Sequence, residues 1–201
     1  MANGPRPALR VLQAIADTDP SESNLQAVAL HRALVELGVE MRTLALAPGT
    51  RPGLEAAVPT IAPGRRTIAA RSAWRAESRW ADVLVLHGAR TATWATAPAR
   101  GEHAGLPVVL ALWDAREWPQ RVGRAERRLL DAATAVVVPD VATRSALSRR
   151  RGAPPDLAPR VVAPRASESS VMEPATDDRG PVDARAWSEL LSTVTAAADV
   201  R

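Results

Sequence analysis

Short apolar runs that alternate with longer helix-patterned segments constrain the fold of this chain more than any other feature. Three of the clearest runs lie at residues 9–16, 82–86 and 135–138. These runs are short and do not alternate between apolar and polar residues, as expected of strands buried on both faces. Strands separated by helices imply right-handed crossovers and a parallel sheet. The pattern predicts a Rossmann-like, three-layer α/β sandwich with a mostly parallel sheet of about six to seven strands.

The first predicted helix, residues 23–37, has the clearest end signals. Ser23 and Gln26 have the spacing of a capping box, and Gly38 stands where a helix end needs positive φ. The other predicted strands are 39–47, 57–62, 107–112 and 160–163, and the other predicted helices are 65–80, 91–99, 122–133, 141–151 and 182–198.

The length of 201 residues suits a single domain. We predict a Rossmann-like domain over residues 1–166 and a linker over 167–181, which is rich in Ser, Glu, Asp and Pro. Residues 182–201 then hold a C-terminal helix that docks back on the same domain. Its apolar stripe consists of Ala186, Trp187, Leu190, Leu191 and Val194.

The residue types that are missing exclude several kinds of chemistry. There is no Cys, and all 26 basic residues are Arg. A thiol nucleophile, a zinc–thiolate site, a P-loop lysine and a Schiff base are therefore excluded. His31, His87 and His103 lack metal-ligand spacing, and no G-x-G-x-x-G follows the first strand. We expect neither a metal nor a cofactor.

The net charge and the lengths of the apolar runs predict whether the protein binds nucleic acid and where in the cell it lies. The net charge is +4 and the pI is about 11.1, but the Arg-rich composition is typical of GC-rich codon usage in a high-GC bacterium. Without a concentrated basic stripe we expect no nucleic-acid binding. The first apolar run is too short for a signal peptide, and none of the runs is long enough to span a membrane. We therefore expect a cytoplasmic protein.

Polar and aromatic residues follow the predicted strands at the edge where such sheets bind ligands. His87 and Gly88 end one strand, and His87 either faces a ligand as donor or base or packs locally. Trp113, Asp114 and Arg116 follow the next strand. They could bind a sugar through ring stacking and a carboxylate, or Trp113 could pack into the core because the chain has no Phe or Tyr.

Two aspartates, Asp17 and Asp19, follow the first strand. They could hold a divalent ion against a diphosphate, or serve a phosphohydrolase of the haloacid dehalogenase type. That family normally needs a later basic residue, typically Lys, which this chain lacks. The third interpretation is that they are loop residues that favour the N-terminus of the next helix.

The predicted helix 65–80 has Arg71, Arg75 and Arg79 on one side and small residues with Trp80 on the other. Such a helix could touch anionic lipid at the inner face of the membrane. Alternatively, it is a surface helix whose apolar side covers the sheet.

Four segments together resemble the N-terminal domain of family-4-like, retaining GT-B glycosyltransferases. NLQAVALHRALVELGVEM is similar to the first helix and second strand of that family, and ADVLVLHG is similar to its D-V-V-H-x-H strand end. PVVLALWD resembles V-V-x-T-x-H-D, and residues 133–163 resemble the A-D-x-V-x-x-V-S and V-I-P-N-G segments. The helix DARAWSELLSTV also resembles the last helix of the family, which packs on the N-terminal domain.

The resemblance implies the acceptor-side half of a glycosyltransferase that binds a sugar or glycolipid acceptor. Sugar transfer from a nucleotide sugar would need a donor-binding partner domain or chain, so the lone chain is expected to be inactive. The family's Gly-Gly is replaced near residues 21–24, and its His after the fifth strand is Trp113. His87 and Asp114 are the catalytic candidates. The acceptor-binding candidates are Asp19, Ser21, Ser23, Asn24, His87, Gly88, Trp113, Asp114 and Arg116.

Two other functions stay open at this point. A non-catalytic interaction module could have kept the fold and lost the activity, because fold does not determine function. The second open function is that of a small phosphohydrolase that uses Asp17 and Asp19.

Overall fold

The computed structural model contains a seven-stranded sheet in the order β3-β2-β1-β4-β5-β6-β7. It describes residues 8–50, 58–61, 68–89, 91, 105–113, 116, 118–119, 121–153, 157, 159–161 and 183–198. The strands are β1 (Arg10–Ile15), β2 (Glu40–Ala45), β3 (Thr60–Ile61), β4 (Val83–His87), β5 (Val108–Ala111), β6 (Ala135–Val138) and β7 (Arg160–Val161). The described helices are α1 (Glu22–Glu36), α2 (Ile68–Trp80), α5 (Arg124–Ala132), α6 (Val141–Ser148) and α7 (Ala184–Ala198).

Each pair of neighbouring strands runs parallel, which confirms the predicted α/β class and makes the sheet fully parallel. β1 pairs with β2 on one side and with β4 on the other. The strands before β4 are added on one side of β1 and the strands from β4 onward on the other side, so the order of addition reverses between β1 and β4. In sheets of this type, ligands bind at that reversal, outside the carboxyl ends of the strands.

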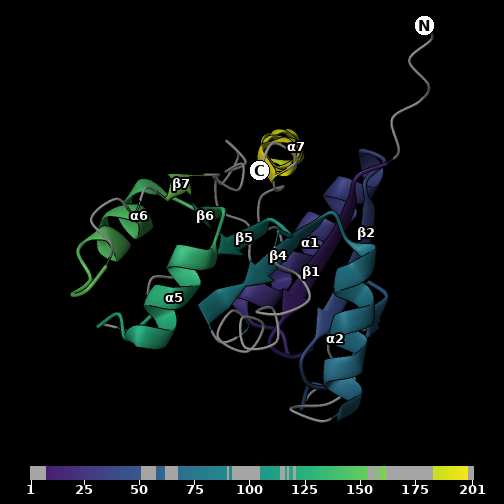
Figure 1. Ribbon diagram of the computed structural model, residues 1–201, viewed down its shortest axis with the longest axis horizontal. Coiled ribbons are helices and arrows are strands. Elements are labelled where there is room, and N and C mark those ends of the chain that lie inside the picture. The colour runs from purple at the N-terminus through teal and green to yellow at the C-terminus, as the bar shows by residue number, and fades with distance from the viewer. Residues whose placement is uncertain are drawn as a thin grey trace, which may run out of the picture.

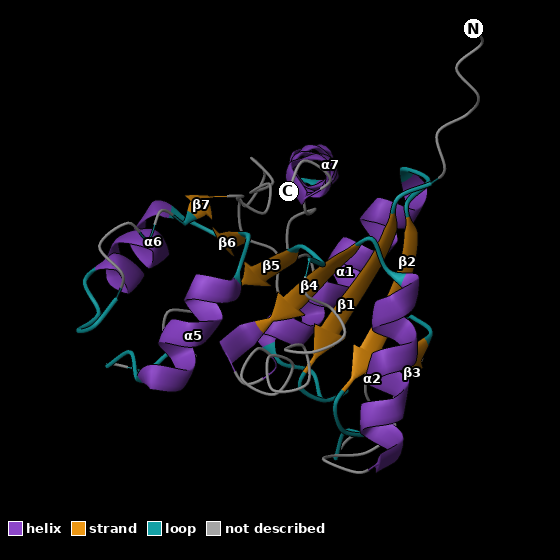
Figure 2. Cartoon of the chain, in the orientation of Figure 1, coloured by secondary structure: helices purple, strands orange, loops and turns teal. Residues whose placement is uncertain are grey.

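Helices cover both faces of the sheet, which gives three layers (Figures 1 and 2). Successive side chains of a strand point to opposite faces. Leu12 and Leu84 accordingly belong to the core that also contains Trp74 of α2, Leu129 of α5 and Leu147 of α6. The neighbouring residues Val11 and Val83 lie in the core beneath α1 and α7.

The last helix docks on the same face as α1. Trp187, Leu190, Leu191 and Val194 are buried there, as the apolar stripe predicts. Docking follows from the 3.6-residue period, because these four side chains share one side of the helix.

Several element boundaries differ from the prediction by one to three residues. The predicted capping serine is wrong: α1 is capped by Ser21, while Ser23 lies inside the first turn and Gln26 bonds to Glu22. Gly38 has φ of +80°, as predicted for the residue after this helix. The predicted linker 167–181 and nearly all of the predicted helix 91–99 lie outside the described residues.

Candidate functional site

A cleft of about 260 Å³ opens between the carboxyl ends of β1 and β4. It lies at the reversal of the sheet, where the turn after β1 leads into α1 and the turn after β4 begins. Five of the candidates from the sequence, Ser21, Ser23, Asn24, His87 and Gly88, come together here. The lining residues are Ala16, Asp17, Ser21, Ser23, Asn24, His87, Gly88 and Ala89.

The N-terminus of α1 forms one wall of the cleft. Ser21 has extended backbone, and its hydroxyl accepts a hydrogen bond from the N–H of Asn24 at 3.2 Å. The Asn24 side chain is 2 % exposed and donates to the carbonyl oxygens of Asp17 and Asp19, both at 2.8 Å. Asn24 therefore shapes the loop that carries the cleft residues. The helix end adds a positive electrostatic field.

The two aspartates after β1 point in different directions. Asp17 lines the cleft, and its carboxylate accepts from the N–H of Asp19 and the amide of Asn24. Asp19 instead accepts from the N–H and hydroxyl of Thr50, at 2.7 and 3.0 Å. The two carboxylates thus stabilise loops, the third interpretation of the sequence. Within the described part of the chain, no group of three or more His, Cys, Asp or Glu side chains could hold a metal ion.

His87 forms the opposite wall and is 1 % exposed. Its Nδ1 atom accepts a hydrogen bond from the indole Nε1 of Trp113 at 3.0 Å, and the two rings are nearly parallel at 13°. In a neutral imidazole the other nitrogen then carries the proton. Among the described residues, Nε2 has no hydrogen-bond partner.

Burial lowers the pKa of His87 to about 3. The charged form is disfavoured because the ring is removed from water. At neutral pH, His87 is therefore a hydrogen-bond donor and a poor general base. The local-packing interpretation made from the sequence holds for Nδ1, which bonds to Trp113, while a role of His87 toward a ligand stays a prediction.

The two described candidates that follow β5, Trp113 and Arg116, do not line the cleft. Trp113 is 6 % exposed and contacts the ring of Trp187 on α7, with centroids 6.1 Å apart. A buried indole cannot stack on a sugar, so the core interpretation holds for Trp113. Arg116 is exposed and is not among the residues that line the cleft, and Asp114 lies outside the described residues.

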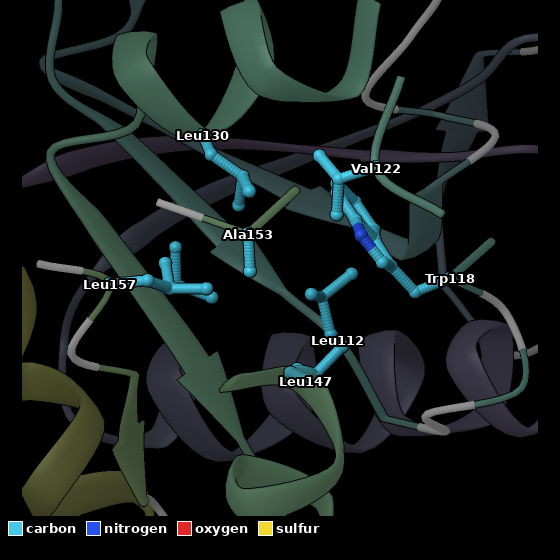
Figure 3. Close-up of a pocket in the computed structure, with 8 residues that line it drawn as sticks. Leu112, Trp118, Val122, Leu130, Leu147, Ala153 and Leu157 are labelled. Carbon is cyan, nitrogen blue, oxygen red and sulfur yellow. The ribbon is translucent and has the colours of Figure 1, made fainter. Parts of the chain in front are cut away.

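A second hollow lies under α5 and α6, between these helices and the sheet (Figure 3). Its labelled side chains come from Leu112, Trp118, Val122, Leu130, Leu147, Ala153 and Leu157. The hollow is apolar and has no space for a water molecule, so it is a feature of core packing.

Helix α2 covers the sheet with its apolar side. Trp74 is fully buried in the core. The guanidinium of Arg42 lies 4.0 Å above the ring of Trp80 and pairs with Glu77 at 2.8 Å. These contacts show that the apolar side of α2 covers the sheet, while lipid contact of this helix stays a prediction. None of the described helices is both long and apolar enough to cross a bilayer.

No family model matches the chain, and no curated protein matches it by sequence. The solved structures that are similar in fold include WaaB and MurG. The apo form of the lipopolysaccharide outer core galactosyltransferase WaaB has a TM-score of 0.53 and 9 % identity, over 84 % of this chain and 49 % of that one. MurG from Acinetobacter baumannii has a TM-score of 0.48 and 18 % identity, over 77 % and 45 %.

The chain spans about half the length of the solved structures it matches. Its fold is similar to about half of the galactosyltransferase WaaB, and it combines a Rossmann-like parallel sheet with the C-terminal helix that the sequence predicts.

Proposed function

We propose that this chain is the acceptor-side half of a GT-B glycosyltransferase and that the cleft between β1 and β4 binds a sugar or glycolipid acceptor. A donor-binding domain or a separate chain would supply the nucleotide sugar. The observation that carries the proposal is the Nε2–H of buried His87, which has no hydrogen-bond partner among the described residues, on a residue that lines the cleft at the reversal of the sheet.

The groups around this cleft suit a ligand rich in hydroxyls. His87 Nε2 and the N-terminus of α1 attract oxygen acceptors, while the Asp17 carboxylate can accept a hydrogen bond from a hydroxyl. A sugar offers both kinds of group. A phosphohydrolase is less well supported, because the Asp19 carboxylate is bound to Thr50 and is not a cleft residue.

Calorimetric titration would test the proposal. The full chain would be titrated with short-chain lipid-linked sugars and, separately, with a panel of nucleotide sugars. We expect the sugar acceptors to bind and the nucleotide sugars not to bind. Nucleotide-sugar binding by this chain alone, or no binding of any acceptor sugar, would contradict the assignment and favour an interaction module.

Two variants sharpen this experiment. His87→Phe keeps a ring but removes the donor, and we expect acceptor affinity to fall at least about tenfold, the effect of one lost hydrogen bond. Ser192→Ala, at an exposed position on α7, is the control and should bind normally. Far-UV circular dichroism would check that both variants are folded.

A further inference from the structure

Three aromatic rings form a continuous row from the C-terminal helix to the cleft. Trp187 on α7 is fully buried and contacts Trp113 at a centroid distance of 6.1 Å. Trp113, just after β5, contacts His87 at 6.2 Å and donates its indole N–H to Nδ1. The row links residues 187, 113 and 87, which are far apart in the sequence but share one face of the sheet.

The direction of the hydrogen bond between Trp113 and His87 decides which nitrogen of the His87 ring carries the proton. An indole nitrogen can only donate, so Nδ1 of His87 must be the unprotonated nitrogen. The ring proton therefore sits on Nε2, the atom without a partner in the described structure. Without a donor from Trp113, either tautomer of His87 would be available, and Nε2 could carry a lone pair in place of the proton.

We propose that Trp113 is a positioning residue that fixes His87 as an Nε2–H donor, and that Trp187 of α7 holds Trp113 in place for this role. Any group that contacts Nε2 must then accept a hydrogen bond, whereas an N–H or ammonium group would meet a second donor there. Only the identity of the ligand rests on the proposed function; the tautomer does not.

The tautomer can be read directly by long-range 1H–15N NMR on the full, 15N-labelled chain without any ligand. The protein has three histidines, and the His87 signals are identified by their loss in His87→Asn. We expect wild-type His87 at pH 7.5 to show a protonated Nε2 and an unprotonated Nδ1. A protonated Nδ1 in the wild type would overturn the proposal without any variant.

Trp113→Phe tests the first link. Phe keeps an aromatic ring but has no donor, so we expect the His87 signals to shift toward a mixture of both tautomers. An unchanged tautomer in this variant would show that Trp113 does not position His87.

Trp187→Leu tests the second link, with Val194→Ala as a matched control. Both changes remove buried apolar bulk from the same face of α7, but Val194 lies two turns from Trp187. We expect the tautomer to become mixed in Trp187→Leu and to stay pure in Val194→Ala. The same tautomer ratio of His87 in Trp187→Leu and Val194→Ala would refute the role of Trp187. Because no ligand is present, these results do not depend on whether the chain binds a sugar.

Discussion

The side-chain amide of Asn24 donates to both the backbone carbonyl and the carboxylate of Asp17, at 2.8 and 3.1 Å. A third bond reaches the carbonyl of Asp19 at 2.8 Å. One buried amide in the first turn of α1 thus fixes the loop that leaves β1. The wall of the cleft depends on this side chain.

We predict that Asn24→Ala destabilises the protein by about 2–3 kcal/mol, because it removes the hydrogen bonds that one buried amide donates to three oxygens of the part-buried loop. Urea unfolding followed by circular dichroism would measure the loss. Ser145→Ala, at a half-buried position on α6, serves as a control outside the cleft. A loss below about 0.5 kcal/mol in Asn24→Ala, the range of ordinary surface changes, would show that the loop is held by other contacts.

Gly49 supports the same loop from the other side. A Cβ atom at this position would lie 2.7 Å from Thr18 Oγ1, 2.8 Å from Asp19 Oδ1 and 3.0 Å from the Asp19 nitrogen. The Gly49 N–H also donates to Thr18 Oγ1 at 2.6 Å. No side chain fits here unless the turn moves.

We therefore expect Gly49→Ala to cost roughly 1–3 kcal/mol, as overpacking usually does, and to weaken any acceptor binding in the cleft. The comparison is Gly38→Asn, since Gly38 has φ of +80° but nothing within 4 Å, and Asn tolerates that conformation. Thermal unfolding would show which of the two variants has the lower melting temperature. A melting temperature for Gly49→Ala at or above that of Gly38→Asn would contradict this account.

The strand pattern could be predicted because it depends on local sequence. The run at 135–138 is a strand with the same limits in the structure, and Gly38 ends α1 with the expected conformation. Such features need only periodicity and backbone sterics. The start of α1 was harder, because Ser21 and Ser23 both suit a cap and only the fold shows which one is used.

The site depended on contacts between distant segments, which a single sequence does not reveal. The cleft residues could be proposed from their position after β1 and β4. The hydrogen bond from Thr50 to the Asp19 carboxylate could not be predicted, because it depends on the position of the turn after β2. The burial of Trp113 required knowledge that α7 covers this part of the sheet, since the amphipathic pattern of α7 predicts docking but not where.

A buried polar network joins β1, β2 and α1. Gln13 donates to Thr43 Oγ1 at 2.7 Å, and Thr43 Oγ1 lies 3.0 Å from Nδ1 of His31. The second bond of the Gln13 amide goes to the carbonyl of Ala27. We predict that Thr43→Val costs about 2 kcal/mol because it leaves buried polar atoms unpaired.

A double variant tests that explanation. Gln13→Leu together with Thr43→Val removes both side chains of the 2.7 Å bond, and we expect it to be more stable than Thr43→Val alone, because the buried amide that lost one of its two acceptors is gone. Denaturant unfolding of the wild type, the two single variants and the double variant gives the coupling energy. Additive losses would show that the two side chains do not interact.

The two described histidines should make stability depend on pH. Burial lowers the pKa of His87 to about 3 from 6.5. The pKa of His31 is also lowered, first by burial and then by the charge of Arg32. Below pH 6.5 the unfolded chain therefore takes up protons that the folded chain does not, so stability falls as the pH falls. For His87 this window extends from 6.5 down to about 3.

We predict that the free energy of unfolding decreases from pH 7.5 to pH 5, with a slope approaching about 1.4 kcal/mol per pH unit from His87 and a contribution of the same sign from His31. Asp82, whose pKa is lowered by its hydrogen bond with Arg10 from 3.8, acts only at lower pH and does not disturb this range. His87→Asn keeps an acceptor for Trp113 but cannot titrate, so its slope should be smaller than that of the wild type. His31→Gln should reduce the slope in the same direction. Urea unfolding at half-unit pH steps would measure all three proteins, and a wild-type slope retained in His87→Asn would mean that the buried ring is not the group that responds.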